Sequence, residues 1–318
     1  MGQRVSTQAA DWDASSISVA PGVIVHVKRS TGRSYLGHFP PGAQPQSGWP
    51  LVVFLHGGGG NAVQFMQQLQ VQEFANANGF AVMFPHGTGT ALAKESLLTW
   101  NAGPGKCGYA AKTNADDVGF ILACVQHFSE RIAPVDPLRV YATGFSNGAM
   151  MCCRLAADRA ASQVFAAVAP VNGCCISDQA SFKPARPVPM LYIHSVDDPR
   201  ALYDGGLGPP FPMTNKRVLH DQVDAFLAQR VQANGCQGPP RQLDSRTDSN
   251  GHSATLLGWF GGPAGTEILH WKLTGGGHAW PGIEQRGRMT ERICGPSTFV
   301  LDATKEIWTY FSSHPKAY

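Results

Sequence analysis

Residues 143–149 read TGFSNGA, a G-x-S-x-G pattern with Ser146 between two glycines. A short, mostly apolar run at 138–142 precedes the pattern, and residues 147–158 follow it with helical character. Strand, sharp turn and helix are the context that this pattern requires. Such a turn leaves no room for a side chain at either glycine. The stretch therefore predicts a serine at the end of a strand and the start of a helix, where the helix dipole favours negative charge.

The pentapeptide alone also fits a glycine-flanked turn that carries an ordinary surface serine. The chain contains 36 glycines, so the pattern can arise by chance. The choice between these two interpretations depends on the other motifs of the chain.

The composition narrows the classes of protein that this chain can be. It has 318 residues, of which 43% are hydrophobic and 15% are charged, and this length suits one large α/β domain or two small ones. The net charge of +3 is spread along the chain without a basic stripe that carries aromatics, so no nucleic-acid partner is expected. No apolar run approaches the roughly 20 residues that span a bilayer, so no membrane partner is expected.

No linker divides the chain into separate units. Residues 1–19 are predicted to form a polar N-terminal tail, and residues 20–318 are predicted to form a single domain that acts as a monomer. The tail lacks the apolar segment of a signal peptide. The sequence therefore leaves the compartment open: secreted or periplasmic if a leader has been removed, and cytoplasmic otherwise.

The eight cysteines show no C-x-x-C spacing and are not accompanied by an H-x-x-x-H pair, so their pattern does not predict a structural zinc site. Their even number permits disulfides. In an oxidising compartment we expect Cys236 to pair with Cys294, because both lie in loops that flank the segment around His278. Such a bridge would stabilise the fold by about 2–4 kcal/mol.

Apolar runs alternate with helical stretches along the chain. A short, wholly apolar run such as 51–55 is typical of a strand buried on both faces of a parallel sheet. The alternation predicts a mostly parallel central sheet with helices on both faces. Strands are expected near residues 23–27, 34–39, 51–55, 80–84, 138–142, 164–169, 189–194, 254–260 and 267–273. Helices are expected near residues 61–78, 116–132, 147–158, 216–233 and 297–311.

Residues 56–61 read HGGGGN and directly follow the predicted strand at 51–55. Four glycines allow the backbone to approach a ligand and point N–H groups at it. A flexible loop and a phosphate cradle are alternatives, but the Lys-Ser/Thr pair of a phosphate-binding loop is absent. The best interpretation is the H-G-G-G loop that supplies backbone N–H groups to an oxyanion in esterases, here from Gly58 or Gly59.

Four features occur at predicted strand ends in a fixed order. They are the glycine loop, Ser146, the pair Asp197 and Asp198, and His278. Nucleophile, acid and histidine in this order are the arrangement of an α/β-hydrolase.

The aspartate pair follows one strand, so strand position alone does not decide which carboxylate faces His278. Successive side chains of an extended segment point opposite ways, so only one of the two can do so. Asp198 precedes Pro199, which biases it towards an extended conformation. We choose Asp198 and expect Asp197 to face away and bond its own loop.

Six segments resemble the polyhydroxybutyrate depolymerase-like esterases, and the resemblance runs from about residue 20 to residue 312. Feruloyl and acetyl-xylan esterases of carbohydrate esterase family 1 are relatives of that family. The blocks around Ser146 and His278 are the most specific. The segments are LHGGGGNA at 55–62, WNAG at 100–103, DDVGF at 116–120, GFSNGAM at 144–150, HSVDDPRALYDGG at 194–206 and GGGHAWPG at 275–282.

The resemblance implies an α/β-hydrolase fold and a serine esterase that needs no metal or organic cofactor. Ser146 would attack an ester carbonyl, and His278 would take its proton and later donate it to the leaving alcohol. The block from His194 to Asp198 places the acid at Asp198, which would orient the imidazole. The N–H groups of Asn147 and Gly58 would form the oxyanion hole.

Other residues of these segments have weaker assignments. Gly59, Trp100 and Trp280 are candidates for substrate binding, although a tryptophan is more often simply packed. His56 and His194 are interpreted as structural residues that fix loops through ring hydrogen bonds. The aspartates at 116 and 117 are interpreted as helix caps, and residues 200–216 as a surface excursion beside the site.

Two further function classes fit the same motifs. An acyltransferase would use the same acyl-enzyme, and a catalytically silent binding module would use the same fold. The intact set of three groups favours a carboxylic ester hydrolase over the silent module. The sequence leaves open whether the ester substrate is small or polymeric, and whether its acyl group is hydroxybutyrate, ferulate or acetate.

Overall fold

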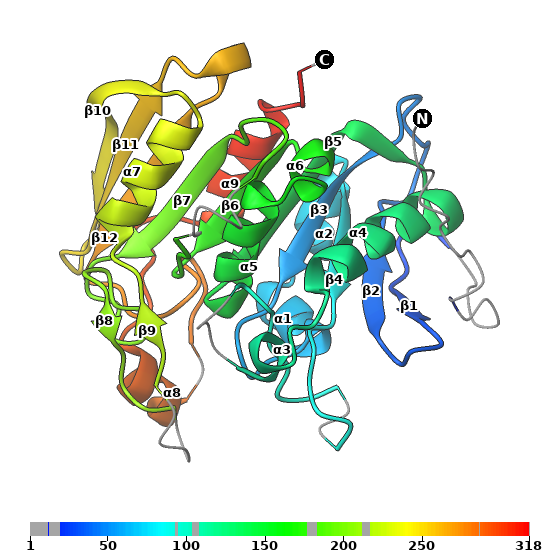
Figure 1. The fold of residues 1–318 in the computed structure, drawn as a ribbon, viewed down its shortest axis with the longest axis horizontal. Coiled ribbons are helices and arrows are strands. Elements are labelled where there is room, and N and C mark those ends of the chain that lie inside the picture. Colours follow the sequence, from blue (N-terminus) through cyan, green and yellow to red (C-terminus); the bar gives the residue numbers. More distant parts are fainter. Residues whose placement is uncertain are drawn as a thin grey trace.

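The strands of the chain form one large mixed sheet in the order β1-β2-β4-β3-β5-β6-β7-β12-β11-β10 (Figure 1). The computed structural model describes residues 12, 20–92, 95–103, 108–176, 183–211, 217–285 and 287–317. The strands from β4 to β12 in this order run parallel, and antiparallel strands flank them on both sides. A separate antiparallel pair is formed by β8 and β9.

The strand bounds are β1 Val25–Lys28, β2 Ser34–His38, β3 Trp49–Leu55, β4 Ala81–Pro85, β5 Val135–Phe145, β6 Ala167–Val171, β7 Met190–Ser195, β8 Gly206–Leu207, β9 Leu219–His220, β10 Gln237–Thr247, β11 Ser253–Phe260 and β12 Ile268–Thr274. The helix bounds are α1 Ala62–Leu69, α2 Gln72–Asn78, α3 Gly108–Lys112, α4 Asp117–His127, α5 Asn147–Ala157, α6 Ala161–Val164, α7 Val223–Ala233, α8 Arg288–Cys294 and α9 Ala303–Ser312. A π-turn at Phe128–Ile132 extends α4, and a short 3₁₀ turn occupies Pro263–Gly265.

Helices cover both faces of the sheet, and two separate apolar cores result (Figure 1). Because successive strand residues point to opposite faces, β3 contributes Leu51 and Val53 to one core and Val52 and Phe54 to the other. The first core contains residues of α4, α5 and α7. The second contains residues of α1, α2 and α9. The predicted α/β-hydrolase architecture, with a mostly parallel sheet between helices, is confirmed.

Several predicted elements have different bounds in the structure. The single helix expected over 61–78 is two helices, because Gln70 adopts the left-handed conformation (φ 48°, ψ 39°) after α1. The helix expected from 216 begins at Val223, and the one expected from 297 begins at Ala303 behind the capping side chain of Asp302. Residues 212–216 lie outside the described chain.

Strand β10 and helix α8 were not predicted from the sequence. Most residues of β10 are exposed, and its register with β11 shifts between Gln237 and Arg241, where two prolines interrupt the ladder. Prolines are tolerated there because β10 is an edge strand. Helix α8 contains no buried residue, so it shows no apolar periodicity that a sequence reading could detect.

The predicted disulfide between Cys236 and Cys294 is wrong, because both thiols are free. Cys236 lies beside the Thr266 carbonyl, just before β12 begins, whereas Cys294 lies beside His278, after β12 ends. The seven residues of β12 separate the two ends of the sheet by about 20 Å. Both cysteines flank the His278 segment in the sequence, but they lie at opposite ends of β12 in the fold.

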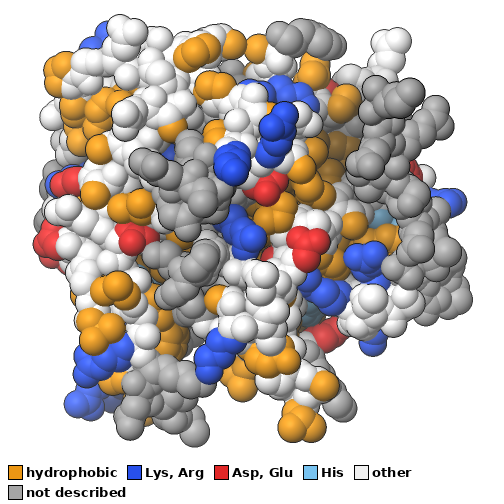
Figure 2. Space-filling view, in the orientation of Figure 1, with side chains coloured by type: hydrophobic (Ala, Val, Ile, Leu, Met, Phe, Trp, Pro, Cys, Tyr) orange, Lys and Arg blue, Asp and Glu red, His pale blue; other side chains and the backbone are white. Residues whose placement is uncertain are grey.

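Every helix in the described part of the chain is too short or too polar to cross a bilayer. On the face that Figure 2 shows, basic and acidic side chains are interspersed. Trp12, inside the segment predicted as a polar tail, stacks on His127 with ring centroids 4.5 Å apart. The proposed boundary at residue 19 stays a prediction.

His270 of β12 is a buried histidine with a neutral imidazole. Its Nδ1 lies 3.2 Å from the Tyr192 carbonyl oxygen, and its Nε2 lies 3.1 Å from the Tyr203 hydroxyl. Burial lowers its pKa to about 3, although the hydrogen bond to Tyr192 opposes this shift. An unfolded histidine has a pKa of about 6.5.

We expect the free energy of unfolding to decrease as the pH falls from about 6.5 towards 3, because only the unfolded chain gains a proton at His270 in that window. Urea unfolding at about pH 7 and pH 4.5 measures this loss. His270→Gln should reduce this loss of stability by up to about 2.5 kcal/mol, because each pH unit below the unfolded pKa is worth about 1.4 kcal/mol. An equal loss in His270→Gln and in the wild type would contradict the assignment.

Candidate active site

Ser146 occupies the turn between β5 and α5. Its backbone is left-handed in φ (φ 55°, ψ −115°), a conformation that residues other than glycine rarely adopt. The Ser146 N–H donates to the Val171 carbonyl oxygen at 2.9 Å, which ties the turn to the end of β6. The turn thus holds a serine in the strained geometry that the sequence pattern predicted.

The glycines around Ser146 allow three backbone segments to pack in contact. A Cβ atom at Gly148 would lie 2.0 Å from the Leu55 carbonyl oxygen, and one at Gly144 would lie 2.6 Å from the Gly148 backbone. These distances confirm that neither glycine can carry a side chain. Gly173 has the same role and was missed: a Cβ there would lie 2.4 Å from the Ser146 carbonyl oxygen.

His278 follows β12 and contacts a buried carboxylate. Its Nδ1 lies 2.7 Å from Oδ2 of Asp198, which follows β7. The other oxygen of Asp198 accepts the N–H groups of Arg200 at 2.7 Å and Ala201 at 2.8 Å. Because β7 and β12 are parallel neighbours, the loops that follow them meet at the same edge of the sheet.

The Asp198 carboxylate is held in its charged form. Burial alone would raise the pKa of Asp198, but the charge of His278, the nearby imidazole of His194 and the hydrogen bond from His278 outweigh burial and lower this pKa below its ordinary value. Asp198 is therefore ionised at neutral pH and accepts a hydrogen bond from the Nδ1–H of His278. This tautomer leaves Nε2 of His278 as the basic nitrogen.

Asp197 has a different contact from its neighbour. Its side chain is exposed, and Oδ2 accepts the Gly275 N–H at 2.7 Å. The sequence predicted that Asp197 would bond its own loop. Its carboxylate instead bonds Gly275 of the loop that carries His278, so Asp197 joins the two loops.

The loop that carries His278 is fixed on two sides. The His278 N–H donates to the Cys294 carbonyl oxygen, and the Phe145 ring packs against the imidazole with centroids 4.6 Å apart. Asn172 donates from Nδ2 to the Ala279 carbonyl oxygen at 2.8 Å. One backbone hydrogen bond, one ring contact and one side-chain hydrogen bond, each from a different segment, thus set the position of the imidazole.

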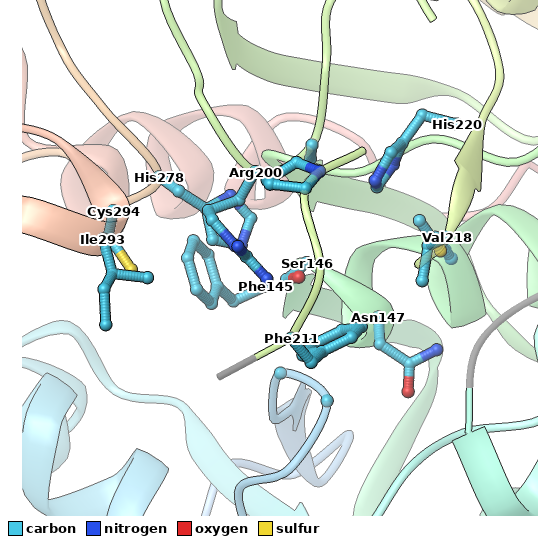
Figure 3. A pocket seen from close by; sticks show the side chains of 15 residues that line it. Phe145, Ser146, Asn147, Arg200, Phe211, Val218, His220, His278, Ile293 and Cys294 are labelled. Atoms are coloured by element: carbon cyan, nitrogen blue, oxygen red, sulfur yellow. The ribbon is translucent and has the colours of Figure 1, made fainter. Parts of the chain in front are cut away.

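Asn147 lines the same cavity as Ser146 and His278 (Figure 3). Gly58 also belongs to the lining of this cavity. Asn147 is the first residue of α5, where backbone N–H groups have no partner within the helix. Its side chain is engaged elsewhere, since Oδ1 accepts the Trp100 N–H at 2.6 Å and Nδ2 donates to the Trp100 carbonyl oxygen at 3.1 Å. These bonds hold the start of α5 against the segment around Trp100.

The cavity has a volume of about 260 Å³ and a mostly apolar wall. Arg200 is the only residue of its lining with a full charge, among the described residues. Arg200, His220, Ile293 and Cys294 were not assigned to the site from the sequence. For Arg200, the only indication in the sequence was its place in the surface segment 200–216, which was predicted to lie beside the site. No local motif marks His220, Ile293 or Cys294.

Over residues 33–243, the chain matches the family described as Esterase PHB depolymerase. The chain belongs to this family. It is therefore a carboxylic ester hydrolase, as the sequence motifs implied.

This esterase resembles proteins from several organisms. It is 32% identical over 263 residues to the protein named "Putative esterase NocK" of Nocardia uniformis subsp. tsuyamanensis, covering 79% of this chain and 71% of the relative. It is 30% identical over 260 residues to feruloyl esterase B of Piromyces equi, covering 78% of this chain but only 42% of that relative. The acetyl xylan esterase from Aspergillus awamori shares the fold, with a TM-score of 0.56, 15% identity and coverage of 91% of this chain and 99% of that one.

The two histidines interpreted as structural are buried in this esterase. His56 lies 2.8 Å through Nδ1 from the Gly57 carbonyl oxygen and accepts the Gly87 N–H at Nε2, at 3.0 Å. Burial lowers the pKa of His56 to about 4, so it stays neutral. His194 contacts the Tyr192 hydroxyl through Nδ1 and the Ala201 carbonyl oxygen through Nε2.

Trp100 and Trp280, the two tryptophans predicted to bind substrate, do not line the cavity. Trp100 is fully buried and donates from Nε1 to the His56 carbonyl oxygen at 2.9 Å. Trp280 is 1% exposed and donates from Nε1 to Oγ1 of Thr304 at 3.1 Å. Both rings belong to the apolar cores, and their indole N–H groups are used there.

Gly59 is also outside the lining of the cavity. Its N–H donates to the Leu98 carbonyl oxygen at 2.8 Å, and its φ of 84° turns the chain away after Gly58. Of the two glycines predicted as oxyanion donors, Gly58 lines the cavity and Gly59 does not.

The aspartate pair at the start of α4 divides into two roles. Asp116 is the helix cap, as expected, and accepts the Gly119 N–H at 2.8 Å. Asp117 does not cap: it is buried and pairs with Arg33 at 2.7 Å. Its Oδ2 accepts the Asn101 N–H at 2.6 Å, so it anchors the segment around Trp100 to α4.

Proposed function

We propose that this esterase works through an acyl-enzyme, with Ser146 as nucleophile, His278 as general base and acid, and Asp198 as the group that orients His278. One observation carries the proposal: the buried 2.7 Å contact between Asp198 and His278 lies at a cavity that Ser146 also lines. A nucleophile and a base that line one cavity, with a buried acid bonded to the base, are the arrangement that activates a serine.

The proposed reaction uses the ordinary chemistry of these groups. Nε2 of His278 removes the proton from Ser146 as its oxygen attacks the ester carbonyl, and the imidazolium then donates that proton to the leaving alcohol. A water molecule repeats the cycle on the acyl-enzyme and releases the acid. The backbone N–H groups of Asn147 and Gly58 stabilise the oxyanion at both stages, aided by the dipole of α5.

Ser146→Ala should abolish labelling by a fluorophosphonate probe and lower kcat by about 10⁴-fold or more, because the nucleophile is gone. In-gel fluorescence and hydrolysis of p-nitrophenyl esters measure the two effects. Ser312→Ala, at an exposed serine of α9, is the matched control and should keep both. Labelling that persists in Ser146→Ala would refute the assignment.

Asp198→Asn should keep the fold and lower kcat by about 10⁴-fold, because an amide at this position favours the wrong tautomer of His278. Asp197→Asn removes a charge from the adjacent position, where the carboxylate accepts only the Gly275 N–H, and it should cost far less than tenfold. Circular dichroism of both variants checks the fold. If Asp197→Asn is the crippling change, Asp198 is not the orienting acid.

For the acyl group, we propose an aromatic acid of the ferulate type, rather than acetate. Two phenylalanine rings, Phe145 and Phe211, line the cavity with Met150, Val218 and Ile293, and aromatic walls suit a planar ring. The cavity volume of about 260 Å³ exceeds what an acetyl group fills. The name of the Piromyces equi relative, feruloyl esterase B, points to the same class of ester.

A panel of methyl ferulate, hydroxybutyrate oligomers, acetylated xylan and p-nitrophenyl acetate tests this choice. Methyl ferulate should give the highest kcat/KM. Phe211→Ala should lower kcat/KM for methyl ferulate by roughly tenfold and leave p-nitrophenyl acetate nearly unchanged, because only the aromatic acyl group contacts the ring. If the wild type prefers hydroxybutyrate oligomers, the proposed acyl group is wrong and an aliphatic hydroxyacid takes its place in the proposal.

A further inference from the structure

His86, directly after β4, is a buried histidine whose two ring nitrogens have no hydrogen-bond partner in the described chain. The residue is 2% exposed, and neither Nδ1 nor Nε2 makes a hydrogen bond within the described chain. Leaving a buried polar group unmatched costs free energy, so such groups call for an explanation. The ester chemistry does not supply one, because His86 does not line the cavity of Ser146.

Two further donor side chains gather at His86. His26 of β1 and Glu95, in the segment after β4, complete a group whose ligand atoms all lie within 4.8 Å of one another. Nε2 of His26 is 3.7 Å from Oε1 of Glu95, and the Ser34 hydroxyl donates to the same oxygen at 2.9 Å. Within the segments that the structure describes, no other group of three such side chains is this close.

The electrostatic surroundings permit a cation at this position. Neither ring nitrogen of His86 has a hydrogen-bond partner in the described chain, so a ring nitrogen is free to bind a metal ion. The nearby guanidinium of Arg33 would repel a cation, but it is paired with Asp117 at 2.7 Å. Glu95 supplies one negative charge on the side of His26.

We propose that His26, His86 and Glu95 bind a Zn²⁺ ion. Two imidazoles and one carboxylate, with water as fourth ligand, are a donor set that zinc accepts. A tetrahedral site with bonds of about 2.0–2.2 Å sets neighbouring ligand atoms roughly 3.3 Å apart. Binding would draw the ligand atoms, which all lie within 4.8 Å of one another, to that spacing. The partly exposed side chains of His26 and Glu95 give the ion a path from solvent.

The ion would join three segments that are distant in sequence. His26 belongs to the edge hairpin, His86 to the end of β4, and Glu95 to the segment that leads to Trp100. The next residue after His86 reaches the active site, because the Gly87 N–H donates to Nε2 of His56, just before Gly57 and Gly58. The ion is thus structural: it braces the wall behind the glycine loop and takes no part in bond cleavage.

Isothermal titration of the chelator-treated full chain with Zn²⁺, paired with Co²⁺ absorption spectra, tests this site. The wild type should bind one more ion than His26→Ala or Glu95→Gln, or bind it at least about 100-fold more tightly. Zn²⁺ should raise Tm in the wild type and not in the two variants. Both substitutions alter partly exposed side chains, so the fold should survive them.

His252→Ala is the matched control, because His252 and Asp248 form an analogous surface pair with 3.6 Å between Nδ1 and Oδ2 but only two donors. This variant should bind Zn²⁺ like the wild type. Zinc bound at the Ser146 cavity would appear equally in all four proteins and would inhibit hydrolysis. Unchanged stoichiometry, affinity and Co²⁺ spectrum in both His26→Ala and Glu95→Gln would overturn the proposal.

Discussion

The close approach of α5 to the end of β3 is the constraint on which the rest of the site depends. At Gly148 the helix backbone lies so near the Leu55 carbonyl oxygen that no side chain fits between them. This contact sets the first turn of α5 beside the glycine loop that follows β3. It also forces the chain through the left-handed conformation at Ser146. The strain of that residue is maintained because the surrounding backbone is packed from three sides.

Parallel pairing of the central strands brings the remaining groups to the same place. The ends of β5, β7 and β12 deliver Ser146, Asp198 and His278 to one edge of the sheet. Loops that follow parallel strands would otherwise be free to vary. Here they are tied to one another by Asp197 with Gly275, by Asn172 with Ala279, and by Asp198 with His278. The result is a set of polar groups held by short Asp and Asn side chains that bond the backbone or the imidazole of a neighbouring loop.

Buried histidines repeatedly connect neighbouring segments near this edge of the sheet. His56, His194 and His270 each bridge two groups through their two ring nitrogens, and the pKa values of His56 and His270 are lowered by burial. A neutral imidazole offers one donor and one acceptor in a fixed geometry, which suits a bridge between two backbone segments. His86 is the exception, because it is equally buried but bridges nothing.

The sequence alone determined the fold class and the order of the chemical groups, because both depend on local pattern. Apolar runs that alternate with helical stretches specify a covered parallel sheet, and G-x-S-x-G specifies a turn that only glycine permits. Pro199 beside Asp198 even indicated which of the two carboxylates would contact His278. The structure has this contact, with 2.7 Å between Oδ2 of Asp198 and Nδ1 of His278. The tertiary structure decided what depends on distant segments: the burial of Trp100 and Trp280 in the cores, the separation of Cys236 from Cys294 by the length of β12, and the residues of the cavity wall. No local pattern encodes these, because packing between residues far apart in sequence determines which side chain faces a cavity and which faces a core.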